Sequence, residues 1–122
     1  MMYYWSEAEG RAMAAEQAME ITVQDLDELR RAGAPHTILD VRNPPEIAIC
    51  AIADSTNIPM QEVPANLDRI PSEGALVVIC HSGMRSYQVT TWLRQNGFAN
   101  AVNLRGGIDS WAREIDTSMA GY

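Results

Sequence analysis

Short apolar runs alternate along this chain with segments of helical spacing, and this alternation constrains the fold more than any other feature. The apolar runs predict strands at 37–41, 55–60, 75–80 and 100–104. Periodicity and capping residues predict helices at 23–31, 43–49, 86–96 and 106–114, with a short helix or turn region at 61–71. Strands that alternate with helices form a parallel sheet whose faces the helices cover. The sequence therefore predicts an α/β fold with a parallel sheet of about five strands and helices on both faces.

The length of the chain, 122 residues, is typical of one domain. Ser6 and Glu9 form a capping-box pattern, which predicts a helix over 7–19. We interpret residues 1–19 as an N-terminal helical extension packed on the main body, and residues 20–122 as the main domain. No repeat, linker or low-complexity segment interrupts that domain.

The charge balance excludes several classes of partner. The net charge is −7, with 16 acidic and 9 basic side chains. Nucleic acid and anionic membranes are therefore not expected as partners, because both attract basic surfaces. All basic residues other than histidine are arginine, so Schiff-base chemistry and a lysine-containing phosphate loop are also excluded.

The cysteine and histidine content indicates neither a disulfide framework nor a metal site. Cys50, Cys80, His36 and His81 could supply four ligands, but their spacing matches no known zinc site. We expect no metal and no cofactor. The sequence shows no basic leader followed by an apolar segment and no apolar run of membrane length, so a cytoplasmic location with reduced thiols is expected.

The stretch CHSGMRS, residues 80–86, joins the clearest predicted strand to a helix. Amides at a helix N-terminus lack internal partners, and the helix dipole adds positive charge, so such a loop binds anions and favours a thiolate. Gly83 lets the backbone curl inward, and Arg85 adds a fixed charge. The loop predicts a nucleophilic Cys80 with an oxyanion beside it. The alternative is a buried structural cysteine followed by an ordinary loop.

The length of this loop separates two kinds of chemistry. Cysteine phosphatases place five residues between cysteine and arginine, whereas this chain places four between Cys80 and Arg85. A shorter loop suits a sulfur atom or the edge of a sulfonate better than a whole phosphate. Sulfur transfer is therefore favoured over a phosphatase or arsenate reductase activity.

Four motifs, in order, resemble those of rhodanese-like sulfurtransferases. CHSGMRS resembles the family's active-site loop Cys-x-x-Gly-x-Arg-Ser, and LDVRNPPE at 39–46 resembles its Asp-x-Arg-x-x-x-Glu motif. NIP at 57–59 and NLRGGIDSW at 103–111 are similar to its later signatures. The chain departs from the family at 50–55, where CAIADS replaces a turn that often contains histidine and two glycines.

The resemblance implies a rhodanese-like fold and a thiosulfate sulfurtransferase that works through a Cys80 persulfide. The donor would be thiosulfate or a protein persulfide, and the acceptor a thiol, cyanide or a protein. Arg85 would hold the sulfonate, while backbone donors would come mainly from His81, Ser82, Gly83, Met84 and Ser86. A sulfur carrier without turnover, or a regulatory module, is the alternative.

Three further residues near the motifs receive structural interpretations. Asp40 and Arg42 are interpreted as an ion pair that supports the loop, with contact to the substrate as the alternative. Cys50 is interpreted as a half-buried structural cysteine, with a resolving thiol for a persulfide as the alternative.

Overall fold

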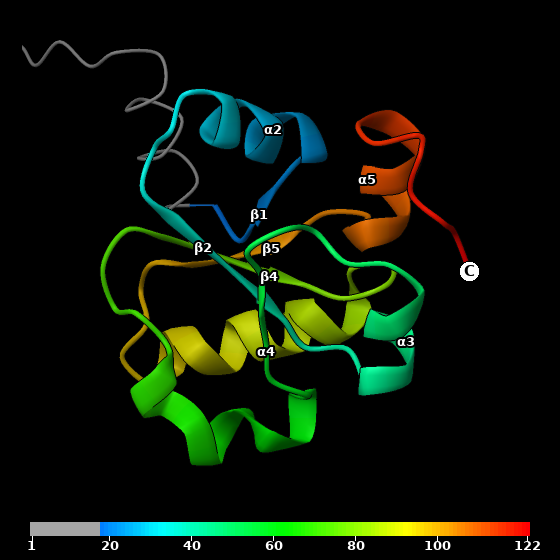
Figure 1. Ribbon diagram of the computed structural model, residues 1–122. Helices are drawn as coiled ribbons and strands as arrows, with labels where there is room; N and C mark the ends of the chain where they lie inside the picture. The colour runs from blue at the N-terminus through cyan, green and yellow to red at the C-terminus, as the bar shows by residue number, and fades with distance from the viewer. Residues whose placement is uncertain (1–17) are drawn as a thin grey trace, which may run out of the picture.

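A computed structural model describes residues 18–122 of the protein (Figure 1). The predicted helix over 7–19 therefore lies almost wholly outside the described residues. The remaining chain forms a five-stranded, fully parallel sheet in the order β1-β5-β4-β2-β3. The strands are β1 (Glu20–Ile21), β2 (His36–Asp40), β3 (Thr56–Asn57), β4 (Ala75–Ile79) and β5 (Ala101–Leu104).

Helices cover both faces of the sheet, which confirms the predicted fold class (Figure 1). Helices α2 (Val23–Arg31) and α5 (Gly107–Glu114) lie on one face, and α4 (Met84–Gln95) and the 3₁₀ segment η1 (Met60–Arg69) lie on the other. The short helix α3 (Pro44–Ile49) follows β2. Thr22 and Asp25 form a capping box at the start of α2, where the sequence predicts a helix start.

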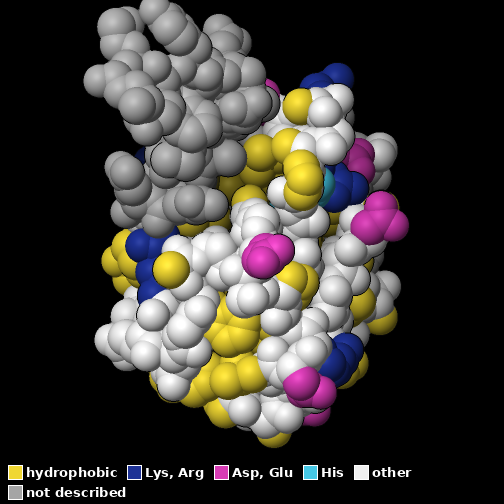
Figure 2. Space-filling model, turned by 90° about the vertical axis from the view of Figure 1, so that its left-hand side faces the viewer, with side chains coloured by type: hydrophobic (Ala, Val, Ile, Leu, Met, Phe, Trp, Pro, Cys, Tyr) yellow, Lys and Arg dark blue, Asp and Glu magenta, His cyan; other side chains and the backbone are white. Residues whose placement is uncertain are grey.

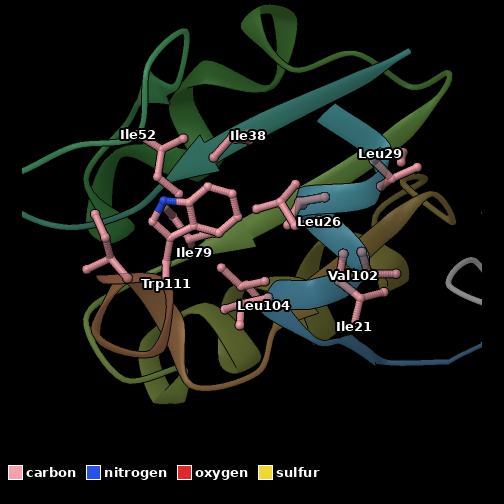
Figure 3. Close-up of a cluster of buried hydrophobic side chains, with 13 residues drawn as sticks. Ile21, Leu26, Leu29, Ile38, Ile52, Ile79, Val102, Leu104 and Trp111 are labelled. Atoms are coloured by element: carbon pink, nitrogen blue, oxygen red, sulfur yellow. The ribbon is translucent and has the colours of Figure 1, made fainter. Parts of the chain in front are cut away.

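Alternation along β4 divides the core into two layers. Ala75, Val77 and Ile79 pack in the layer of α2 and α5, whereas Leu76, Val78 and Cys80 pack in the layer of α4. Figure 3 shows the first layer, in which the indole of Trp111 lies close to Ile52 and Ile38. The alternation of side chains between the two faces of a strand therefore directs Cys80 toward α4.

Several element boundaries differ from the sequence-based expectation, and two differences lie at β1 and at the start of α4. The expectation gave no strand to Glu20–Ile21, yet these two residues form β1 and pair with Asn103 and Leu104 of β5. Helix α4 starts at Met84 rather than at 86, because Gly83 takes a left-handed conformation (φ 101°) and serves as its N-cap. The second difference brings the N-terminus of α4 to the loop that begins at Cys80.

The described residues contain no helix long and apolar enough to cross a membrane. Their arginine side chains on the face shown in Figure 2 are scattered among acidic ones and do not gather into one patch.

Candidate active site

The candidate site lies at the carboxyl ends of the two central strands. Asp40 ends β2 and is paired in register with Ile79, which ends β4. Cys80 follows the end of β4 directly, and Arg42 lies two residues beyond the end of β2. Ligand sites of parallel α/β sheets form at this edge, so the fold brings together the two motifs that the sequence separates by almost forty positions.

The sulfur of Cys80 lies inside the loop that leads into α4. The residue is 1% exposed. Its Sγ accepts hydrogen bonds from the backbone N–H of Gly83 at 3.1 Å and from the hydroxyl of Ser86 at 3.2 Å. Donors directed at a sulfur stabilise its anionic form. The amide of Gly83 is therefore turned toward the sulfur, and Ser86 places its side-chain hydroxyl against it.

Glycine is required where this loop meets the loop after β5. A Cβ on Gly83 would lie 3.2 Å from the amide nitrogen of Gly106 and 3.3 Å from the carbonyl oxygen of Leu104. The first amides of α5 bind the loop that begins at Cys80, because Ile108 N–H donates to the Cys80 carbonyl at 2.9 Å and Asp109 N–H donates to the His81 carbonyl at 3.0 Å. The helix N-terminus of α5 thus holds the backbone of the candidate nucleophile.

Glycine is required more strictly at the first residue of α5. Gly107 has a φ of 61°, and a Cβ there would lie 2.5 Å from the carbonyl oxygens of both Cys80 and His81. Such contacts do not occur in folded proteins without backbone movement. The GG pair of NLRGGIDSW therefore lets α5 approach the loop.

Arg85 forms a two-pronged ion pair with Glu46 of α3. Its Nη1 and Nη2 donate to Oε1 and Oε2 at 2.7 and 2.8 Å. The hydrogen bond from Arg85 lowers the pKa of Glu46 to about 2, and the same bond raises the pKa of Arg85. A guanidinium has five N–H donors, so Arg85 retains donors for an anion while Glu46 is bound.

Asp40 and Arg42 form the predicted ion pair, fully buried behind the loop. Arg42 Nη2 donates to Asp40 Oδ2 at 2.7 Å, and its Nε donates to Oδ1 at 2.9 Å. Burial lowers the pKa of Arg42, but the hydrogen bonds and charges of Asp40 and Tyr122 together outweigh it and raise the pKa of Arg42. Asn57 of the NIP motif donates to the carbonyls of both Asp40 and Arg42, which fixes the end of β2.

Tyr122 packs against the site, and sequence reasoning did not find it. Its hydroxyl donates to Glu46 Oε2 at 2.7 Å and accepts from Arg42 Nη1 at 3.1 Å. Its ring stacks on His81 with centroids 4.1 Å apart and an angle of 17° between the ring planes. Burial raises the pKa of Tyr122. The C-terminal segment thus connects three of the residues that surround the loop.

The remaining predicted residues lie farther from the sulfur. Ser82 is exposed, and the Met84 side chain is 75% exposed, so neither side chain contacts Cys80. His81 Nε2 is buried without a hydrogen-bond partner among the residues that the structure describes. Cys50 is half-buried, with its Sγ 3.9 Å from Arg42 Nη1. Within 18–122 no cluster of three or more histidine, cysteine or acidic side chains could hold a metal ion.

Fold and site together define a class of small α/β domains in which a cysteine ends a parallel strand and the next helix begins around its sulfur. A family model described as the rhodanese-like domain matches residues 22–114, and the chain belongs to this family. The resemblance seen in the four motifs is therefore confirmed.

The chain is also similar to individual proteins. It is 43% identical over 76 residues to a sulfurtransferase of Allochromatium vinosum, a match that covers 62% of this chain and 71% of the relative. It is 34% identical over 113 residues to the adenylyltransferase and sulfurtransferase MOCS3-2 of Zea mays, which covers 87% of this chain but only 23% of that protein. The crystal structure of SSP1007 from Staphylococcus saprophyticus superposes with a TM-score of 0.73 and 39% identity, over 80% of this chain and 97% of that one. Family and relatives support a sulfurtransferase role of the rhodanese type.

Proposed function

We propose that this protein moves sulfane sulfur from thiosulfate, or from a protein persulfide, to a thiophilic acceptor through a persulfide on Cys80. The observation that carries the proposal is the pair of donors, Gly83 N–H and Ser86 O–H, directed at the Cys80 sulfur. Such donors stabilise both the attacking thiolate and the persulfide anion that replaces it.

The reaction has two steps. The Cys80 thiolate attacks the outer sulfur of thiosulfate, the sulfur–sulfur bond of thiosulfate breaks, and sulfite leaves with the electron pair. Cys80 then carries one additional sulfur as an anionic persulfide. In the second step a thiol, cyanide or a protein nucleophile attacks that outer sulfur, and the Cys80 thiolate leaves. A covalent intermediate of this kind divides one difficult transfer into two easier ones.

Arg85 is the proposed partner of the sulfonate during the first step. It lies at the start of α4, five residues after Cys80, and its side chain is 35% exposed. Its unused N–H groups can donate to an oxyanion while Glu46 stays bound. The backbone of His81, Ser82, Gly83, Met84 and Ser86 would complete the substrate site.

A transfer that starts from a protein persulfide is favoured by a second observation. Arg85 and Arg42 are each paired with a carboxylate, Glu46 and Asp40 respectively. These pairs reduce the net positive charge that a thiosulfate dianion would meet. The rates of sulfur transfer from thiosulfate and from a protein persulfide distinguish these two donors. A sulfur carrier without thiosulfate turnover reacts only with the protein persulfide.

The mass of the intact protein after mixing with thiosulfate tests the proposal. We expect a gain of one sulfur atom on the wild type and none on Cys80→Ser. Cys50→Ser is the matched control, and it should gain sulfur as the wild type does. If the gain in mass persists in Cys80→Ser and disappears in Cys50→Ser, the sulfur is carried by Cys50 and the proposal names the wrong thiol.

A second test concerns Arg85. Arg85→Ala should lower kcat/KM for thiosulfate about tenfold or more, since a hydrogen bond to a charged group is lost. Arg105→Ala is the control, because Arg105 lies near the same edge of the sheet and is highly exposed. Equal kinetics for Arg85→Ala and the wild type would remove Arg85 from the substrate site.

The domain boundary and the location also belong to the proposal. We place the sulfurtransferase domain at 20–122, because β1 begins at Glu20 and pairs with β5. A cytoplasmic location would keep the Cys80 thiol reduced between turnovers.

A further inference from the structure

Asn103 is a fully buried polar residue on β5, beneath the catalytic loop. Residues two apart on a strand share a face, so Asn103 shares the face of Ala101, which packs in the same core layer as Cys80. Its backbone lies between β1 and β4 through pairing with Glu20 and Val78. A polar side chain in this position requires hydrogen-bond partners.

The partners of Asn103 determine how its amide group is oriented. Nδ2 faces the carbonyl oxygen of Gly83 at 3.1 Å and Oε2 of Glu20 at 2.9 Å. Both partners are acceptors, so the amino end of the amide must lie on this side. Oδ1 then faces the hydroxyl of Ser86 at 2.5 Å and accepts its hydrogen. Asn103 thus holds Gly83 and Ser86, the two residues whose N–H and O–H donate to the Cys80 sulfur.

We infer that Asn103 is a positioning residue for Cys80, acting through Gly83 and Ser86. The inference rests on the proposed role of Cys80 as the nucleophile. One end of the amide fixes the carbonyl of Gly83, while the N–H of the same residue binds the sulfur. The other end fixes the Ser86 side chain in the rotamer that places its Oγ 3.2 Å from the sulfur.

The Ser86 hydroxyl gives Asn103 a role in both protonation states of Cys80. The hydroxyl has one hydrogen and two acceptors within reach, Asn103 Oδ1 and Cys80 Sγ. With a neutral thiol, the S–H donates to Ser86 Oγ and the hydroxyl donates to Asn103. With a thiolate or a persulfide anion, the hydroxyl turns its hydrogen to the sulfur, because a bond to a charged acceptor is the stronger one. In that anionic state Asn103 holds the loop through its other end, the bond from Nδ2 to the Gly83 carbonyl.

The test compares Asn103→Ala with Asn100→Ala. Asn100 is also a buried asparagine next to β5, and its Nδ2 also binds two carbonyl oxygens, those of Pro71 and Gly74, but it lies at the opposite end of the strand. The measurement is the rate of alkylation of Cys80 by iodoacetamide against pH, in a Cys50→Ser background. Asn103→Ala should move the midpoint of this profile up by about half a pH unit or more, since the thiolate loses oriented donors. Asn100→Ala should lower only the stability.

A midpoint in Asn103→Ala equal to that of the wild type would overturn the inference, whatever the loss in stability. Should Asn103→Ala fail to fold, Asn103→Asp keeps the size of the side chain but cannot donate to Gly83 or Glu20. An unchanged midpoint in that variant would overturn the inference equally. Because alkylation needs no sulfur donor, the profile tests Asn103 even if the wild type takes up no sulfur from thiosulfate, a result that would count against the proposed function alone.

Discussion

Replacing Gly107 by alanine should push α5 away from the loop that begins at Cys80. The residue has a φ of 61°, and its new Cβ would lie 2.5 Å from the carbonyl oxygens of Cys80 and His81. These are the two carbonyls that accept from Ile108 and Asp109. Relief of the overlap therefore moves the same backbone groups that hold the candidate nucleophile.

Gly33 provides a control with almost the same backbone geometry. Its φ is 64°, but a Cβ there would meet no atom within 4 Å. Gly33→Ala should cost only the left-handed strain of an L-residue, about 1 kcal/mol. Gly107→Ala adds the overlap, about 1–3 kcal/mol, and weakens two hydrogen bonds worth about 1 kcal/mol each. The difference between the two variants should be about 3 kcal/mol.

Urea unfolding followed by tryptophan fluorescence measures both free energies of unfolding, since Trp111 is buried within the core that α5 covers. Sulfur uptake from thiosulfate, measured by intact mass, should slow in Gly107→Ala and stay unchanged in Gly33→Ala. If the two variants lose the same free energy of unfolding and the same activity, the contact between α5 and the loop does not stabilise the protein and the reasoning is refuted.

Three further predictions concern the charged groups around the loop. The pKa of Glu46, about 2, lies below its ordinary 4.5, so its ion pair stabilises the protein above pH 4.5 and this contribution disappears as the pH falls toward 2. Urea unfolding should show Glu46→Gln about 1 kcal/mol less stable than the wild type at pH 6, a modest difference because Arg85 is partly exposed. Near pH 2 the two proteins should be equally stable. A difference in the free energy of unfolding that stays constant with pH would contradict this prediction. Tyr122→Phe should lower the free energy of unfolding by about 1 kcal/mol, because it loses the hydroxyl bonds to Glu46 and Arg42 but keeps the stack on His81. Tyr122→Ala should lower it further in the same urea measurement. Equal losses of stability in the two variants would show that the stack contributes nothing. Arg42→Met leaves Asp40 buried and unpaired, so unfolding should become easier by about 3 kcal/mol or more, and a loss below about 1 kcal/mol would argue against a structural role for the pair.

The parts of the fold that the sequence predicts are those with strong local patterns. The run at 75–80 is long enough to identify a buried strand, and Thr22 with Asp25 identifies a helix start. Once the strands are known to be parallel, the position of Cys80 at a strand end follows. Strand β1 was missed because two residues carry no periodicity, and only pairing with β5 makes them a strand.

The parts of the site that the sequence does not predict depend on contacts between distant residues. Tyr122 lies 76 positions from Glu46 and 80 from Arg42, and no local pattern indicates that it returns to the loop. Asn103 carries a weak signal, a polar residue at a strand position that should be buried. Its partners could not be deduced, because they lie on β1, in the loop and on α4.

Both outer strands of the sheet are only two residues long, whereas β2 and β4 in the middle have five each. A long outer strand would present a row of unpaired N–H and C=O groups on which another copy of the chain could add its own strand. Within 18–122 neither outer strand offers a row of that length, so the sheet gives little opportunity for intermolecular β-pairing. The order of the strands thus helps to protect a strongly apolar centre from aggregation.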